Sequence, residues 1–264
     1  MKIRSLGAGA LALMVALSSA SAVSAATVAE SLMLQPSASG AIGATVNGAL
    51  DTGTANVDVD VVTLGGGYIR TATTWDGSRS FDYPRYVNSS TPPRAVLRVR
   101  NSGGGDDLAP ARADFVFGAD FTLDRDSTGS TVDDGDNLVQ RGTFGSASQY
   151  KIDVDGGRVS CRIKGSSGAV TIKSSLRAKP GLWYRVRCAR SGNDVQVTTT
   201  EYRGDGTSRV VRDEARGSTG SLKWVDSRAP MSVGGKLTRR GDIVRSSTDQ
   251  FNGSVGRVVF RIYS

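Results

Sequence analysis

The chain has 264 residues, of which 33 are Lys or Arg and 25 are Asp or Glu, so its formal charge at pH 7 is +8. It contains no histidine, which excludes Ser-His-Asp and Cys-His catalytic arrangements and any His-ligated zinc site. The basic excess fits a partner with an acidic surface, such as a polysaccharide, but it equally fits a protein that needs charge only for solubility.

The first 25 residues have the pattern of a secretory signal peptide. Lys2 and Arg4 precede the apolar run Leu6–Leu17, and small residues ending at Ala22 or Ala25 offer a cleavage site. The run is too short for a permanent membrane anchor, and no later run reaches that length. We therefore expect a secreted, extracellular protein, with a short N-terminal helix as the alternative. Loss of the two basic residues would lower the charge from +8 to +6.

Residues 26–56 form a second compositional region, rich in Ala, Gly, Ser and Thr and with little periodicity. This composition is typical of an exposed lead-in or linker, although residues 32–36 and 44–50 could each add an edge strand. Regular alternation begins at residue 57. The predicted domain therefore covers residues 57–264.

Short alternating segments fill the chain from residue 57 onward, and clusters of Gly, Asp and Ser separate them. Alternation with a period of two predicts half-buried strands, and no helical pattern of ten or more residues occurs. Many short strands with regularly spaced turns are typical of an all-β sandwich or barrel. The predicted strands cover residues 57–62, 68–74, 95–100, 113–124, 137–142, 149–155, 158–163, 169–174, 183–190, 194–202, 208–215, 231–235 and 256–264.

The two cysteines lie on the apolar sides of predicted strands. Cys161 shares its side with Val159 and Ile163, and Cys188 shares its side with Val186. In an oxidising compartment two such cysteines are expected to form one disulfide in or beside the core. Two buried free thiols are the alternative.

Five segments of the second half stand in a fixed order: ADFVFGADFTLD, NLVQRG with QYKIDVDGGRVSCRI, GLWYRVRCARSGNDVQV, MSVGGKL and DQFNGSVGRVVFRI. This order resembles the laminin G-like domains of the concanavalin A-like lectin/glucanase superfamily, over about residues 113–264. The earlier segment SFDYPRY resembles an early strand of that family. Tyr184 departs from the pattern, because the family usually has a packing histidine there.

The resemblance implies a two-sheet antiparallel β-sandwich, the concanavalin A-like jelly roll. It also implies that sugars or proteins bind at the loops along one rim, often with a calcium ion. A fold alone assigns no ligand.

An acidic connection follows the predicted strand 113–124. Calcium takes about six to eight oxygen ligands, and a loop can supply them as carboxylates and carbonyls. The connection matches the first half of an EF-hand loop, but Gly135 stands where a bidentate Glu is required. The alternative is an acidic loop neutralised by Arg125 and Arg141. The candidate calcium ligands are Asp124, Asp126, Asp133, Asp134 and Asp136.

Basic residues occupy the polar sides of both cysteine strands. If these strands share one sheet, the residues form an arginine-rich surface suited to carboxylates, sulfates or phosphates, with a merely solvated sheet face as the alternative. Tryptophans in turn-rich segments could stack on sugar rings. The candidate ligand-binding residues are Arg162, Lys164, Arg185, Arg187, Trp75 and Trp224.

No pattern for catalysis is found. The Glu-x-Asp-x-x-Glu signature of superfamily glucanases is absent, and Asp153 and Asp155 precede a Gly-Gly turn that selects Asp for its conformation. We therefore expect a non-catalytic binding module for a polysaccharide or cell-surface glycoconjugate, with calcium as the candidate cofactor. The alternatives are a protein-adhesion module, a structural envelope protein, and a polysaccharide hydrolase or lyase that uses carboxylates or Tyr and Arg. Nucleic acid is not an expected partner.

Overall fold

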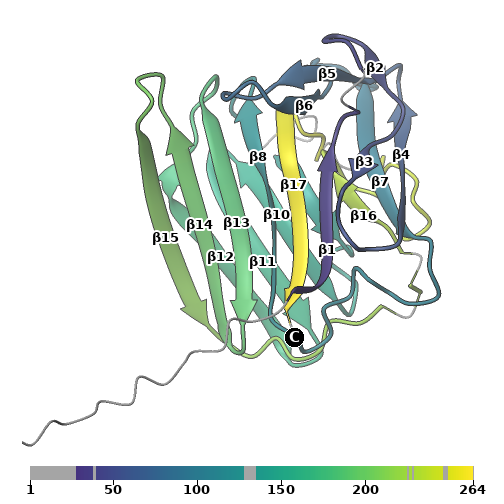
Figure 1. Ribbon diagram of the computed structural model, residues 1–264, viewed down its shortest axis with the longest axis vertical. Coiled ribbons are helices and arrows are strands. Elements are labelled where there is room, and N and C mark those ends of the chain that lie inside the picture. The colour runs from purple at the N-terminus through teal and green to yellow at the C-terminus, as the bar shows by residue number, and fades with distance from the viewer. Residues whose placement is uncertain are drawn as a thin grey trace, which may run out of the picture.

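The structure is a computed structural model that describes residues 28–37, 40–127, 135–224, 226–227, 229–245 and 249–263. Within these ranges the chain forms strands and turns but no helix, so the described part holds no helix able to cross a membrane. The predicted signal peptide, residues 1–25, lies outside the described residues. The strands form two antiparallel sheets stacked face to face (Figure 1).

The ten-stranded sheet lies in front in Figure 1. Its strand order is β15-β14-β13-β8-β17-β6-β5-β2, and β1 pairs with both β17 and β3. The strands are β1 Val28–Gln35, β2 Thr45–Val46, β3 Leu50–Asp51, β5 Ile69–Thr73, β6 Arg79–Asp82, β8 Phe115–Leu123, β13 Trp183–Ser191, β14 Asp194–Tyr202, β15 Ser208–Arg216 and β17 Gly253–Tyr263.

The seven-stranded sheet lies behind, in the order β12-β11-β10-β9-β16-β7-β4. Its strands are β4 Val57–Leu64, β7 Arg94–Asn101, β9 Asp136–Arg141, β10 Gln149–Asp155, β11 Arg158–Gly165, β12 Gly168–Arg177 and β16 Met231–Val233. The predicted all-β, two-sheet antiparallel sandwich is confirmed.

The core fills the space between the two sheets. Alternation along each strand turns the apolar side chains inward, and aromatic rings meet there across the sandwich. Tyr150 of β10 lies 5.0 Å from Phe117 and 5.4 Å from Phe260, measured between ring centroids, and these partners come from β8 and β17 of the other sheet. The side chains on the inward face of each sheet therefore pack in the core.

The N-terminal segment joins the ten-stranded sheet. β1 pairs antiparallel with β17 from Leu34 with Val258 to Val28 with Tyr263, and both Leu32 and Leu34 are fully buried. From the sequence alone, this segment could be either an exposed linker or a source of added strands. In the structure it adds strands to the sandwich.

The predicted disulfide is confirmed, and it links the two sheets. Cys161 lies on β11 of the seven-stranded sheet and Cys188 on β13 of the ten-stranded sheet, 27 residues apart. In the chain-entropy model, closing a loop of this length contributes about 3.5 kcal/mol to the free energy of unfolding. Both cysteines point inward, so the polar sides of their strands face opposite surfaces of the molecule.

The prediction of one shared arginine-rich surface is therefore wrong. Arg162 and Lys164 lie on the outer face of the seven-stranded sheet, whereas Arg185 and Arg187 lie on the outer face of the ten-stranded sheet. Alternation reports which side of its own strand a residue occupies, but it does not report which sheet holds that strand.

A long connection covers part of the seven-stranded sheet. In the described part of the connection between β16 and β17, residues 234–245 pack over the outer face near β7, where Leu237 and Ile243 form a small apolar cluster with Val96. The Arg98 guanidinium donates a hydrogen bond of 3.1 Å to the Gly241 carbonyl oxygen and pairs with Asp60. At β9 the connection accepts a hydrogen bond of 3.2 Å from the Asn137 side chain to the Gly235 carbonyl oxygen, and the outer face of β10 to β12 lies beyond these contacts.

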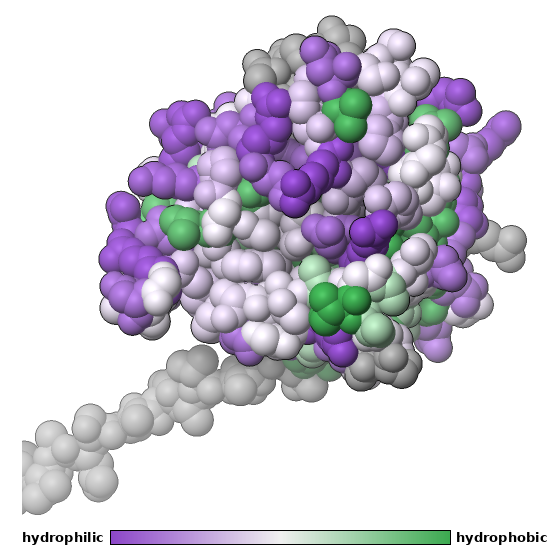
Figure 2. Space-filling view, turned by 90° about the horizontal axis from the view of Figure 1, so that it is seen from above, coloured by the Kyte–Doolittle hydropathy of each residue, from purple (hydrophilic) through white to green (hydrophobic). Residues whose placement is uncertain are grey.

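The end of the sandwich that carries β2 and β5 is at the top in Figure 1 and faces the viewer in Figure 2. Hydrophilic side chains dominate this view, and the hydrophobic ones are scattered rather than merged into a broad patch (Figure 2). This end therefore offers polar groups to a partner, not a continuous apolar docking face.

Candidate binding groove on the seven-stranded sheet

A transverse row of polar side chains crosses the outer face of the seven-stranded sheet. Each residue of the row is paired in register with the next one on the adjacent strand. Because their neighbours along each strand face the core, these side chains face outward. From β12 to β4 the row consists of Thr171, Arg162, Lys151, Gln140, Ser232, Arg98 and Asp60.

A cavity of about 150 Å³ lies over the uncovered half of this row, between the β9–β10 loop and the β16–β17 connection. We call it the groove. Its floor is polar but recessed, since Gln140 is 3% exposed, Gln149 2% and Ser160 8%. The groove is lined by Gln140, Phe144, Gln149, Lys151, Asp153, Ser160, Arg162, Thr171 and Lys236.

Hydrogen bonds fix the polar groups of the floor. The Arg162 Nε donates to the Gln149 side-chain oxygen at 3.1 Å, and an Arg162 terminal nitrogen donates to the Thr171 hydroxyl at 3.1 Å. The Gln149 amide nitrogen in turn donates to the Gly142 carbonyl oxygen at 3.1 Å. Arg162 is therefore held in one orientation before any ligand arrives, which lowers the entropy cost of binding.

An exposed aromatic ring stands beside this floor. Phe144, in the β9–β10 loop, is 75% exposed, and the Arg162 guanidinium lies 5.1 Å from its ring centroid. The Lys164 ammonium group donates to the Phe144 carbonyl oxygen at 3.2 Å. Phe144 is not among the candidate residues predicted from the sequence. The available signal was a single large apolar residue within a loop of Gly, Ser and Thr.

Among the described residues, some of the cations in and beside the groove pair with carboxylates, and others do not. Lys151 pairs with Asp153 at 3.2 Å, and Lys236 pairs with Asp249 at 2.9 Å. The hydrogen bonds of Arg162 and Lys164 instead go to uncharged groups. These two positive charges therefore favour an anionic group in a ligand.

On the opposite face, Arg185 and Arg187 have a structural role. The fully buried carboxylate of Asp120 accepts hydrogen bonds from Arg185 at 2.8 and 2.9 Å, from Arg187 at 3.3 Å and from Arg257 at 3.4 Å. Burial lowers the pKa of Arg187 to about 10, because desolvation outweighs the attraction of Asp120. These arginine side chains therefore bind a carboxylate of the protein itself, that of Asp120.

The β5–β6 loop covers this buried carboxylate. Asp76 of the loop pairs with Arg257, which also donates to the Ser78 hydroxyl at 2.9 Å. Trp75 stacks on Tyr202 of β14 with a centroid distance of 4.1 Å, although the indole remains 47% exposed. Trp75 therefore lies on the other side of the sandwich from the groove.

Trp224 lies beside the groove, across the β9–β10 loop. The Arg141 guanidinium lies 4.2 Å from the centroid of its ring, and Tyr150 contacts it edge to face at 5.7 Å. Arg141 is fully buried and pairs with Asp106 at 2.7 Å. The suggestion that Arg141 neutralises the acidic loop is therefore wrong, because its side chain points into the protein.

The acidic loop is described in part. Asp133 and Asp134 lie outside the described residues. Burial raises the pKa of Asp124 above its usual value, an effect that Arg85 opposes. Asp136 is buried and accepts a hydrogen bond of 2.9 Å from the Asn252 backbone N–H.

One oxygen of this loop stands out. The Oδ1 of Asp126 is shielded from water and has no hydrogen-bond partner within the described residues. Arg125, the other suggested neutraliser, lies over the Tyr86 ring at 4.2 Å from its centroid. No group of three or more Asp, Glu, Cys or His suited to a metal occurs among the residues with described positions. The calcium ligand set stays a prediction.

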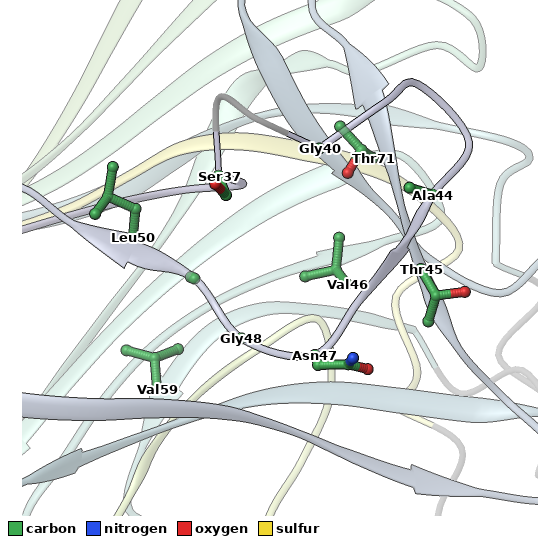
Figure 3. Close-up of a pocket in the computed structure, with 11 residues that line it drawn as sticks. Ser37, Gly40, Ala44, Thr45, Val46, Asn47, Gly48, Leu50, Val59 and Thr71 are labelled. Atoms are coloured by element: carbon green, nitrogen blue, oxygen red, sulfur yellow. The ribbon is translucent and has the colours of Figure 1, made fainter.

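A further cavity, of about 420 Å³, lies next to the N-terminal strands (Figure 3). Small and apolar side chains such as Ala44, Val46 and Val59 line it, together with Thr45 and Asn47 (Figure 3). None of the described residues that line it is charged. It does not offer the chemistry expected for an acidic ligand.

Comparison with known proteins gives a family match in the second half of the chain. Residues 137–261, from β9 to β17, match the family model of the laminin G domain. The predicted resemblance to laminin G-like domains is confirmed over this range. No curated protein has a sequence that matches the chain.

Several solved structures share the architecture. The binding domain of Paraclostridial Mosquitocidal Protein 1 is 13% identical with a TM-score of 0.55, and the match covers 87% of this chain and 48% of that one. The Botulinum Neurotoxin serotype G binding domain is 7% identical with a TM-score of 0.50, covering 87% and 46%. The chain thus spans about half the length of these structures. At such identities the likeness concerns the fold alone.

Proposed function

We propose that this laminin G-like sandwich is a binding module that holds an acidic polysaccharide or glycoconjugate in the groove. The recessed polar floor carries the proposal. Gln140, Gln149 and Ser160 face outward from the sheet and yet are almost fully shielded. A sheet face that needs only solvation has no reason to recess such groups, whereas a concave site with fixed donors and acceptors suits a ligand rich in hydroxyls.

The class of ligand follows from the charges and the ring beside this floor. Arg162 presents a planar fork of donors that fits a carboxylate or sulfate, and Lys164 adds a second positive charge. Phe144 offers an exposed flat face on which the apolar side of a sugar ring can stack. An acidic sugar matches all three features.

A binding role also agrees with the comparisons, since both toxin structures that share the architecture are binding domains by name. We propose that the role is non-catalytic. Glycoside hydrolysis generally needs two carboxyl groups, and Asp153 is the only carboxylate among the described residues that line the groove. We further propose that the protein acts outside the cell, which the signal-peptide pattern and the disulfide support.

Replacing Arg162 with alanine should weaken binding to an acidic polysaccharide by about tenfold or more, because a charge-assisted hydrogen bond is lost. The mature protein would first be screened on a glycan array of acidic and neutral polysaccharides, and affinities for the hits measured by calorimetry. Arg216→Ala is the matched control, because its pair with Asp194 is exposed on the other sheet. Absence of any glycan binding, or equal losses in both variants, would contradict the proposal.

We also propose a calcium ion in the loop that contains residues 124–136, which the unpartnered Asp126 oxygen supports. Addition of calcium should raise the melting temperature of the mature protein, and a chelator should reverse this rise. Asp126→Asn should abolish the response, whereas Asp194→Asn should retain it. If the melting temperature does not move in wild type, no calcium site exists there.

A further inference from the structure

A second cavity lies across the β9–β10 loop from the groove. It measures about 370 Å³, and we call it the Trp224 pocket. Phe144 of that loop lines the groove, whereas Thr143 and Ser146 of the same loop line the pocket. The two hollows therefore share one narrow wall.

The wall and the side of the pocket are held in fixed positions. The Thr143 backbone N–H donates to the Ser146 hydroxyl at 2.9 Å, which closes the loop on itself. The Ser148 hydroxyl donates to the Lys223 carbonyl oxygen at 2.8 Å and accepts from the Lys223 backbone N–H at 3.1 Å. These bonds join the β9–β10 loop to the segment that carries Trp224, so both sides of the pocket keep their spacing.

The chemistry of the pocket repeats that of the groove. Trp224 supplies an aromatic wall that Arg141 and Tyr150 hold from the protein side. Among the described residues that line the pocket, two are exposed cations from different connections, Lys223 before β16 and Arg239 after it, and one is a carboxylate, Asp226. Each hollow therefore combines an aromatic ring, small polar groups and an excess of positive charge.

We propose that the Trp224 pocket is a second subsite for the same ligand, a linear acidic polysaccharide whose chain crosses the β9–β10 loop over the exposed ring of Phe144. This inference rests on the proposed function of the groove. A single acidic sugar would need only one of the two hollows. A polymer with a negative charge on successive units would meet Arg162 and Lys164 on one side of the loop and Lys223 and Arg239 on the other.

The test measures how affinity depends on chain length. Oligogalacturonates of defined length would be titrated into the mature protein, from the disaccharide to the octasaccharide. Wild type should bind the octasaccharide at least about tenfold more tightly than the disaccharide, because occupying both subsites makes the second contact intramolecular. In Lys223→Ala/Arg239→Ala this gain should disappear, while the disaccharide affinity stays unchanged. In Arg162→Ala/Lys164→Ala both affinities should fall.

The matched control is Arg209→Ala/Arg212→Ala, which removes two positive charges from β15 on the other sheet. It should retain the full gain with length. Equal losses in this control and in Lys223→Ala/Arg239→Ala would overturn the second subsite, because bulk charge would then explain the effect. Disaccharide binding without any gain with length overturns the second subsite alone. Absence of binding at every length overturns the proposed function as well.

Discussion

Replacing Asp120 with asparagine should lower the free energy of unfolding by about 3–5 kcal/mol, the usual cost of removing one partner from a buried ionic cluster. The carboxylate is fully buried among the guanidinium groups of Arg185, Arg187 and Arg257. A neutral amide would leave three positive charges close together with only Asp76 to balance them. Urea denaturation of wild type and variant would measure the loss.

The control for this prediction is Asp194→Asn. Asp194 also pairs with an arginine of the ten-stranded sheet, but its side chain is 67% exposed and that of Arg216 is 81% exposed. Solvent screens such a pair, so its loss should cost less than about 1 kcal/mol. A denaturation midpoint of Asp120→Asn that matches this control would show that the cluster contributes little to stability.

Replacing Arg141 with methionine should have a comparable effect, about 3–5 kcal/mol, because it breaks a buried ion pair and several hydrogen bonds together. The Arg141 Nη1 and Nη2 donate to the Asp106 carboxylate at 2.7 and 3.1 Å. Nη2 also donates to the Ser227 carbonyl oxygen, and Nε donates to the Ala229 carbonyl oxygen, at 3.0 Å each. One side chain thus attaches the β7–β8 and β15–β16 connections to β9. Denaturation would give the stability, and amide exchange at Ser227 and Ala229 should accelerate.

Arg98→Met is the matched control for this second prediction. Arg98 lies on the same sheet and also pairs with an aspartate, but the Asp60 side chain is 49% exposed. The expected cost is about 1 kcal/mol. Equal destabilisation by the two variants would argue against a special role for the buried arginine. Arg141→Lys keeps the charge without the fork of donors and should fall between wild type and Arg141→Met.

Much of the fold was predictable from local patterns. Period-two alternation located the strands from residue 57 onward except β6, Arg79–Asp82, and the expected export predicted the disulfide. The sheet assignment was not predictable, because β13 pairs with β8 through contacts such as Arg185 with Asp120, which are far apart in sequence. For this reason Arg185 and Arg187 were grouped with residues of the opposite face.

The site was less predictable than the fold. Arg162 and Lys164 do line or border the groove, but Gln140 and Gln149 carry no motif, and only strand register brings them together. For Arg141 the sequence did hold a signal of burial. Period-two alternation places it on the same side of β9 as the core residue Val139. A charged residue in an inward position indicates a buried partner that sequence alone does not identify.

The bond between Cys161 and Cys188 makes a covalent ring of the chain between β11 and β13, with β12 and the β12–β13 connection inside it. A protease that cuts once inside this ring separates no piece from the rest, because both fragments stay joined through the sulfur atoms. The two sheets, and with them the floor of the groove, therefore remain attached after such a cut. A reducing agent would have to act before the fragments could part.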